Sequence, residues 1–286
     1  MSTNIDAAAA GRLVLGGDLE VNRLGFGAMR ITGRGAWGDP PDVATAVRVL
    51  QRAVGLGVTF IDTADSYGPG TSESLIARAL HPYGAELVIA TKGGLVRPGP
   101  DHWNRDARPE HLRAACEDSL RRLRRERIDL YQLHAPDPNV RLEDSIGELV
   151  RLQGEGKIRH IGVSNVTVAE LKRCERLTPI VSVQNRYNQE DRGSEEVLAY
   201  CASRGIAFLP WAPLGSGRHA RGSGSRALAR VAERHGITAG LASIAWLLGH
   251  SPVVLPIPGT GSIAHLEENI AAASVRLTPQ DMQDLD

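Results

Sequence analysis

Four side chains of different chemistry follow short apolar runs of the sequence: Asp62, Tyr67, Lys92 and His134. A phenol has a pKa of about 10, so Tyr67 by itself is a poor acid at neutral pH. The ammonium group of a nearby lysine lowers that pKa, and a carboxylate holds the ammonium in place. A histidine can donate a hydrogen bond to a substrate oxygen. The four therefore suit protonation of a carbonyl oxygen while hydride, which none of them carries, reaches its carbon from a cofactor.

Eight short apolar runs rich in Val and Ile are typical of strands that are buried on both faces. We expect strands at residues 24–27, 58–61, 87–90, 128–133, 158–163, 181–183, 207–209 and 253–257. Helical patterns alternate with them at residues 40–56, 72–80, 109–123, 142–155, 168–176, 195–204, 226–249 and 263–273. Eight β-α units close a (β/α)8 TIM barrel, whose active site lies at the carboxyl ends of the strands. The pattern predicts a single α/β barrel domain over residues 1–286.

A doubly wound open sheet is the alternative fold. Such a sheet usually begins with a GxGxxG turn directly after its first strand, but the first expected strand here runs into Gly27-Ala28-Met29-Arg30 instead. Ahead of the barrel, residues 12–15 and 19–21 flank Gly16-Gly17-Asp18, a pattern typical of a β-hairpin. We expect this hairpin to cap the amino-terminal face of the barrel. The Gly-, Ser- and Arg-rich stretch at residues 215–225 predicts a mobile loop.

The composition is that of an ordinary globular protein, with 42% hydrophobic and 23% charged residues among 286. Lys and Arg together number 33, and Asp and Glu together also number 33, so the formal net charge is zero. This balance gives no indication of binding to a nucleic acid or a membrane. The three cysteines form no CxxC pair and the histidines lack metal-ligand spacing, so we expect buried free thiols and no metal. No signal-peptide pattern and no membrane-spanning apolar stretch is present, which predicts a cytoplasmic protein.

The residues that could do chemistry lie in stretches that together resemble the signatures of the aldo-keto reductase superfamily. These stretches are residues 60–68 (FIDTADSYG), 90–94 (ATKGG), 132–135 (QLHA), 162–165 (GVSN), 183–188 (VQNRYN) and 257–260 (IPGT), with Glu268-Asn269. They follow in the family's order, and the match extends from about Arg12 to Leu277. Residues 29–38 and 94–103 also resemble the bacterial pyridoxal reductase-like branch.

The resemblance implies a role for each of the four residues. Tyr67 is expected to be the proton donor. Lys92, paired with Asp62, is expected to lower the pKa of Tyr67, and His134 is expected to orient the carbonyl. The resemblance further implies NADPH as the cofactor, with Asp62 beside it. The substrate pocket is expected to be lined by Trp37 and Trp103, together with Tyr67 and His134.

The resemblance also implies a set of residues along the cofactor. Ser164, Asn165 and Gln184 are expected to bind the nicotinamide carboxamide, and Trp211 to stack on the ring. Residues 214–217 are expected near the pyrophosphate, and residues 259–262 are expected to hold the adenosine phosphate. The remaining expected contacts are Gly27, Met29, Pro213, Leu214, Gly215, Ser216, Gly217, Gly259, Thr260, Gly261, Ser262 and His265, with Glu268 and Asn269 near the adenine.

One departure from the family's pattern concerns the 2′-phosphate of NADPH. Many members hold it with Lys or Arg where this chain has Gly259 and His265. A lost charge-assisted hydrogen bond is worth about 1.5–3 kcal/mol, or about 10- to 150-fold in affinity. Arg218 and Arg221 could compensate, and a helix amino-terminus also binds anions. We expect NADPH to be preferred, with NADH as the alternative.

The predicted reaction is reversible hydride transfer between NADPH and a small aldehyde or ketone, with pyridoxal among the candidates. Two alternatives stay open: a nicotinamide-nucleotide-sensing regulatory subunit with little turnover, and an NAD-linked alcohol or polyol dehydrogenase. The expected partner is a small carbonyl compound, and the expected state is a monomer or weak homo-oligomer. The short tail beyond Ala273 predicts a pocket that is open on one side and accepts varied carbonyls.

Overall fold

A curled sheet of parallel strands forms the centre of the structure, a computed structural model in which residues 5–215 and 223–286 are described. The strand order is β11-β10-β9-β8-β5-β4-β3. The strands span β3 Phe26–Gly27, β4 Phe60–Asp62, β5 Val88–Gly93, β8 Ile128–Leu133, β9 Ile158–Ser164, β10 Ser182–Gln184 and β11 Ala207–Phe208. Each overlaps one of the first seven expected strands, so these predictions are confirmed.

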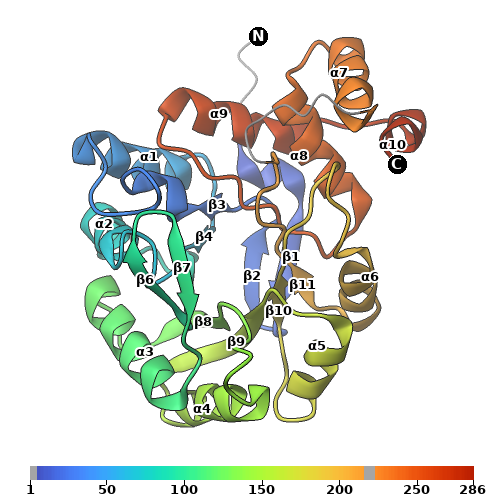
Figure 1. Cartoon of the computed structure of the whole chain (residues 1–286). Helices are drawn as coiled ribbons and strands as arrows, with labels where there is room; N and C mark the ends of the chain where they lie inside the picture. The colour runs from blue at the N-terminus through green and yellow to red at the C-terminus, as the bar shows by residue number, and fades with distance from the viewer. Residues whose placement is uncertain (1–4, 216–222) are drawn as a thin grey trace.

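Residues 253–258 close the sheet into a barrel, because they bond to both of its edge strands. On one edge, the N–H of Leu255 donates to the carbonyl of Phe208 at 2.9 Å. On the other, the N–H of Gly25 donates to the carbonyl of Pro256 at 2.9 Å. Pro256 has no N–H of its own, so this eighth segment cannot complete a regular ladder. The structure is therefore the expected (β/α)8 barrel, which Figure 1 shows end-on.

Helices form an outer ring around the strands (Figure 1). They span α1 Val43–Gly55, α2 Thr71–Leu80, α3 Pro109–Leu123, α4 Leu142–Gly154, α5 Val168–Glu175, α6 Glu195–Arg204, α7 Ser223–His235, α8 Ala239–His250 and α9 Ile263–Ala271. Pro109 occupies the first turn of α3, where its missing N–H has no cost. A capping box of Thr167 and Glu170 begins α5. Helix starts are thus set by local residues that the sequence displays.

The single helix expected at residues 226–249 is wrong, because α7 and α8 share this segment. Gly236 has a φ of 62°, a left-handed backbone just after the end of α7. Thr238 then caps α8 by accepting the N–H of Leu241 at 3.3 Å. Apolar residues continue across the break, so periodicity alone does not reveal it. Helix α7 begins inside the loop expected at residues 215–225, of which residues 216–222 lie outside the described residues.

Several elements were not expected from the sequence. Residues 95–105, between two of the expected barrel elements, form an antiparallel hairpin of β6 Leu95–Gly99 and β7 His102–Arg105. The tail forms α10 Pro279–Leu285, which packs on α7 and α8. Three short 3-10 helices complete the set: η1 Ala7–Ala10, η2 Ala28–Ile31 and η3 Ala272–Ser274.

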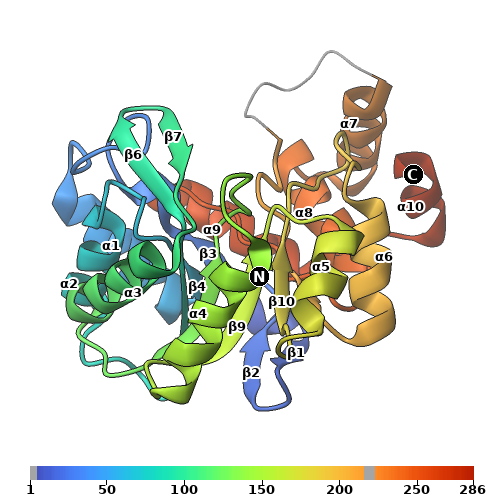
Figure 2. The same ribbon diagram turned by 60° about the horizontal axis from the view of Figure 1, so that its bottom comes forward.

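The amino-terminal hairpin forms as expected, from β1 Arg12–Leu15 and β2 Leu19–Asn22. Its side chains Leu15, Leu19 and Val21 are buried in one apolar cluster with residues of the barrel interior such as Leu130 and Leu255. The hairpin therefore plugs one end of the barrel. Figure 2 shows it at the bottom of the molecule, with β6 and β7 at the opposite end, where the strand carboxyl ends lie.

Three further features of the structure concern membrane-spanning helices, metal sites and the cysteines. Within residues 5–215 and 223–286, no helix is long and apolar enough to cross a membrane. The same residues hold no group of three or more His, Cys, Asp or Glu placed to bind a metal. Cys116, Cys174 and Cys201 are buried free thiols, as expected, and burial raises the pKa of each to about 12.

Candidate active site

The four predicted catalytic residues meet at the carboxyl ends of three neighbouring strands. Asp62 is the last residue of β4, Lys92 is next to last in β5, and His134 directly follows β8. These strands are adjacent in the sheet order β8-β5-β4. Tyr67 lies in the connection between β4 and α2. Parallel strands end at one edge of a barrel, so the fold brings the four together.

Lys92 is the centre of the cluster, and its side chain is fully buried. Its Nζ donates to Asp62 Oδ2 at 2.7 Å, to the carbonyl of Thr63 at 2.8 Å and to Tyr67 Oη at 3.4 Å. These three acceptors match the three donors of an ammonium group. Burial acts to lower the pKa of Lys92, but Asp62 and Tyr67 together raise it above the ordinary value. The lysine is therefore charged at neutral pH.

The second carboxylate oxygen of Asp62 is held by two amide side chains. Gln184 Nε2 donates to Asp62 Oδ1 at 2.7 Å, and Gln132 Nε2 donates to the same oxygen at 3.3 Å. Gln184 was expected at the nicotinamide, whereas Gln132 was not expected to take part. Both amides stabilise a carboxylate that is almost completely buried, which costs free energy unless it is bonded.

Tyr67 differs in one respect from the expectation. Burial raises its pKa, Lys92 opposes this increase, and the net pKa lies above the ordinary value. The expected effect of Lys92, which is to lower the pKa of Tyr67, is present, but burial outweighs it because the phenol is taken out of water. Lys92 still makes Tyr67 a stronger acid than burial alone would leave it.

His134 lies edge-on to Tyr67, with ring centroids 5.8 Å apart. Burial, and secondarily the charge of Lys92, holds the pKa of His134 well below its usual range. The imidazole is therefore neutral at neutral pH. Its Nδ1 lies 3.4 Å from Ser66 Oγ. A neutral ring can donate one hydrogen bond to a substrate oxygen, but it is not a proton source at this pH.

The residues expected at the nicotinamide form a second cluster beside the first. Ser164 ends β9, Gln184 ends β10, and Asn165 takes a left-handed backbone with φ of 58°, which Asn tolerates well. Asn165 Nδ2 donates to Ser164 Oγ and to the carbonyl of His134, both at 3.0 Å. Trp211 Nε1 donates to Asn165 Oδ1 at 3.1 Å. The structure thus brings all four residues of this set together.

The expected phosphate-binding turn lies next to the end of β3. A Cβ placed on Gly259 would lie 2.4 Å from the carbonyl oxygen of Gly27, so no side chain fits there. This contact explains why Lys is absent at position 259. Ser262 is the N-cap of α9, and its N–H donates to Thr260 Oγ1 at 3.1 Å. The N–H groups at the start of α9, near His265, are therefore directed towards this turn.

The residues expected along the pyrophosphate are only partly described. Met29 and Leu214 are exposed, and the carbonyl of Pro213 accepts a hydrogen bond from Ser243 at 2.9 Å. Gly215 has a φ of 68°. The expected contacts Ser216 and Gly217, and the compensating cations Arg218 and Arg221, lie outside the described residues.

Arg30 is a residue of this region that the sequence-based prediction missed. Arg30 Cγ lies 3.6 Å from the position that a Cβ on Gly259 would take. The carbonyl oxygen of Arg30 lies 3.2 Å from the position that a Cβ on Gly261 would take. An exposed cation therefore borders the turn where the family's lysine is missing. The available signal was its position, directly after the first strand and Met29.

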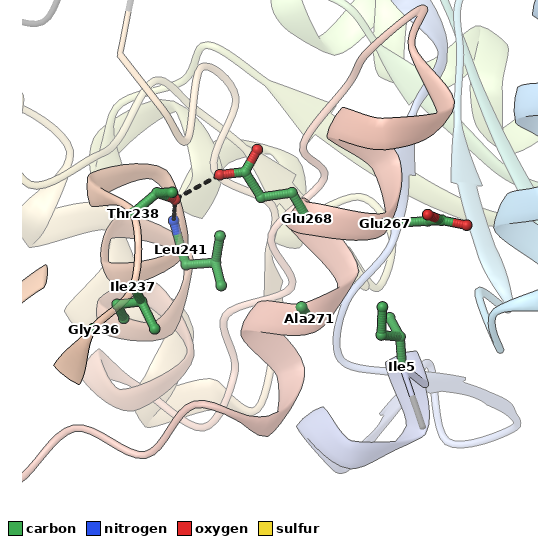
Figure 3. A pocket seen from close by; sticks show the side chains of 8 residues that line it. All are labelled: Ile5, Gly236, Ile237, Thr238, Leu241, Glu267, Glu268 and Ala271. Carbon is green, nitrogen blue, oxygen red and sulfur yellow. Dashed lines mark hydrogen bonds between the residues drawn. The ribbon is translucent and has the colours of Figure 1, made fainter. Parts of the chain in front are cut away.

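Glu268, expected near the adenine, lines a cavity of about 550 Å³ between the start of α8 and α9. Its carboxylate accepts a hydrogen bond from Thr238 Oγ1 at 2.6 Å, as Figure 3 shows. Asn269 is buried next to it in α9. None of the four predicted catalytic residues lines this cavity, so it is separate from their cluster.

Of the two tryptophans expected to line the substrate pocket, Trp103 reaches the cluster of predicted catalytic residues. Its ring lies edge-on to Tyr67 at 6.2 Å and to His134 at 6.4 Å between centroids. Trp37 lies further out, with the guanidinium carbon of Arg97 5.9 Å from its ring centroid.

Asp65 is a buried acid behind the catalytic loop, and its Oδ1 has no hydrogen-bond partner among the described residues. Burial, and secondarily the nearby Glu73, raises the pKa of Asp65 to about 8. Unfolded, an aspartate has a pKa of about 3.9. Between these values folding takes up a proton, so the stabilising contribution is complete below about pH 4 and is lost as the pH rises to about 8.

We therefore expect Asp65→Asn to gain stability relative to the native protein as the pH rises from 5 to 8, by up to about 1.4 kcal/mol per pH unit. Urea unfolding at several pH values measures this difference. The exposed Asp39→Asn is the matched control. A stability difference that does not change with pH would show that Asp65 is ionised in the folded protein.

The chain belongs to the aldo/keto reductase family, whose sequence model matches residues 23–286. An uncharacterized oxidoreductase of Schizosaccharomyces pombe is 46% identical over 286 residues, 100% of this chain and 92% of that protein. The pyridoxine 4-dehydrogenase of Escherichia coli is 39% identical over 277 residues, 94% of this chain and 96% of that protein. A solved aldo/keto reductase from Klebsiella pneumoniae, in complex with NADP and acetate, has 28% identity and a TM-score of 0.81, over 96% of this chain and 94% of that chain. The family resemblance read from the sequence is therefore confirmed.

Proposed function

We propose that this protein is an NADPH-dependent reductase of small aldehydes and ketones. The observation that carries the proposal is the position of Lys92 Nζ, which bonds to both Asp62 and Tyr67 beside a neutral His134. Such a set has no evident structural purpose, because burying charged and phenolic groups costs free energy. The proposal takes residues 1–286 as one barrel domain, which the family match over residues 23–286 supports.

In the proposed mechanism, Tyr67 Oη donates its proton to the carbonyl oxygen of the substrate. The ammonium of Lys92 stabilises the phenolate that this transfer leaves, and Asp62 keeps Lys92 charged and in place. His134, being neutral, donates a hydrogen bond that orients the carbonyl. NADPH, when bound, supplies the hydride that reaches the carbonyl carbon. The reverse reaction uses the same groups with Tyr67 as the base.

The donor and acceptor set beside the cluster fits a nicotinamide carboxamide, which offers one carbonyl and one NH2 group. Asn165 Nδ2 is a donor, and the side-chain oxygen of Gln184 is an acceptor. Ser164 Oγ donates to the carbonyl of Gln184 at 2.6 Å and could donate to the ligand by exchanging that bond. Binding would exchange the bond from Asn165 Nδ2 to Ser164 Oγ for one to the ligand. The NADP complex of the relative from Klebsiella pneumoniae supports this choice of cofactor.

Arg30 is our candidate for the cation that the family's pattern lacks. We expect Arg30→Gln to weaken NADPH binding by about 10- to 150-fold, the value of one charge-assisted hydrogen bond. Fluorescence titration with NADPH and with NADH measures this change, and the exposed Arg34→Gln is the control. A loss confined to NADPH would assign Arg30 to the 2′-phosphate, and a loss for both cofactors to the pyrophosphate. Unaltered affinity for both would contradict the assignment.

The first test of the function is the loss of absorbance at 340 nm with NADPH or NADH, using pyridoxal and an activated aromatic aldehyde. The 39% identity with pyridoxine 4-dehydrogenase supports pyridoxal as one substrate, although that name describes the opposite direction. Turnover of only the aromatic aldehyde would support the reductase activity and exclude pyridoxal as a substrate. Tight cofactor binding without turnover of either aldehyde would favour a nucleotide-sensing subunit instead.

A further inference from the structure

Arg97, in β6, is a buried arginine whose guanidinium bonds only to backbone carbonyls. Nε donates to the carbonyl of His102 at 2.7 Å. Nη1 donates to the carbonyls of Ala36 at 2.9 Å and Ser66 at 3.1 Å. Nη2 donates to the carbonyls of Gly35 at 2.6 Å and Gly99 at 3.3 Å. These five carbonyls match the five N–H donors of a guanidinium. Among the salt bridges of the described residues, none involves Arg97. The guanidinium is thus committed to holding backbone in place.

The five carbonyls belong to three separate segments of the chain. Gly35 and Ala36 lie in the connection before α1, Ser66 directly precedes the catalytic Tyr67, and the others lie in the β6–β7 hairpin. One side chain therefore joins two loops at the barrel mouth to the catalytic loop. A lysine could not do this, since it has three donors on one atom rather than a planar fork.

The same guanidinium covers one side of Trp103. The carbon Cζ of Arg97 lies 3.6 Å from the ring centroid, a close cation–π contact. Trp103 remains 38% exposed, and its ring makes T-shaped pairs with Tyr67 and His134, at interplanar angles of 83° and 65°. Trp103 is therefore fixed by a buried cation while it keeps a free apolar surface beside the two groups that would meet the carbonyl.

We propose that Arg97 is a positioning residue that holds Trp103 as a rigid wall for planar aromatic or heteroaromatic aldehydes. The inference rests on the proposed reductase function and names the substrate class of that site. A flat ring that stacks on an immobilised indole gains aromatic contact without the cost of ordering the wall. Small aliphatic aldehydes are too short to use this surface, so they gain little from it.

The test compares 4-nitrobenzaldehyde with propanal in steady-state NADPH oxidation by the native enzyme, Arg97→Met and Arg97→Lys. Aromatic contacts are worth about 0.5–1.5 kcal/mol, so both variants should lower the ratio of kcat/KM for the aromatic aldehyde over propanal by about 2- to 12-fold. The loss should appear mainly in the KM of the aromatic aldehyde. The exposed Arg105→Met, on the same hairpin, is the matched control. Trp103→Leu, which leaves the Arg97 hydrogen bonds intact, should reproduce the loss and covers the case in which Arg97 variants do not fold.

An unchanged ratio in the Arg97 and Trp103 variants would overturn the inference. It would also be overturned if both aldehydes lost kcat equally, because Arg97 would then only support the catalytic loop at Ser66. Equal kcat/KM for the two aldehydes in the native enzyme would remove the planar preference but keep the reductase. No turnover of either aldehyde by the native enzyme would instead count against the proposed function itself, so the two failures are distinguishable.

Discussion

Tyr67→Phe is expected to lower kcat for aldehyde reduction by about 10²- to 10⁴-fold, the usual contribution of a positioned general acid. Phe keeps the ring that packs against Trp103 and His134 and removes only the hydroxyl that lies 3.4 Å from Lys92 Nζ. NADPH affinity should stay close to the native value, because the nicotinamide and phosphate residues lie in other segments. The measurement is kcat and KM from NADPH oxidation, together with a fluorescence titration for cofactor binding.

The expected loss is large because no neighbouring group can replace the phenol. The pKa of His134 lies well below its usual range, so its neutral ring holds no acidic proton at pH 7. Lys92 donates two of its three N–H groups to Asp62 and to the carbonyl of Thr63, and its pKa lies above the ordinary value, so it releases a proton less readily than a free lysine. Tyr67→His offers a useful comparison, since it places a second imidazole near the same position. A Tyr67→Phe variant that turns over at near the native rate would exclude Tyr67 as the proton donor.

The sequence predicts the barrel well because its signals are local and repeated. Each buried parallel strand is a short Val- and Ile-rich run, and the polar residue that ends it is visible in the sequence, as with Asp62 after β4 and Lys92 in β5. The convergence of these residues follows from one rule, that parallel strands end at the same face. The strand-end residues could therefore be placed together before any coordinates were known.

What the sequence does not predict depends on contacts between distant segments. The β6–β7 hairpin carries mostly exposed or half-buried side chains, so it has no clear alternation. One of its own residues, Arg97, joins it to the carbonyl of Ala36 in a distant segment. Gln132 looks like any strand residue until its amide meets Asp62 from 70 positions away. Burial, likewise a tertiary property, raises the pKa of Tyr67 by more than Lys92 lowers it.

Lys92→Met is expected to cost about 3–5 kcal/mol of unfolding free energy, the typical effect of removing one partner from a buried ion pair. Met has a similar volume, so the loss is electrostatic and not one of packing. Asp62 Oδ2 would lose its ammonium donor while its side chain stays 3% exposed. Urea unfolding of the native protein and the variant measures the difference.

A double-variant cycle separates the charge effect from general damage. Asp62→Asn together with Lys92→Met removes the buried carboxylate as well as the ammonium, so the pair should be more stable than Lys92→Met alone. If the two destabilisations simply add, the ion pair is not the source of the cost. Tyr67→Phe removes no charge and should unfold close to the native protein, although its kcat is expected to fall by about 10²- to 10⁴-fold. The comparison thus distinguishes a residue that performs proton transfer from one on which both the reaction and the folded barrel depend.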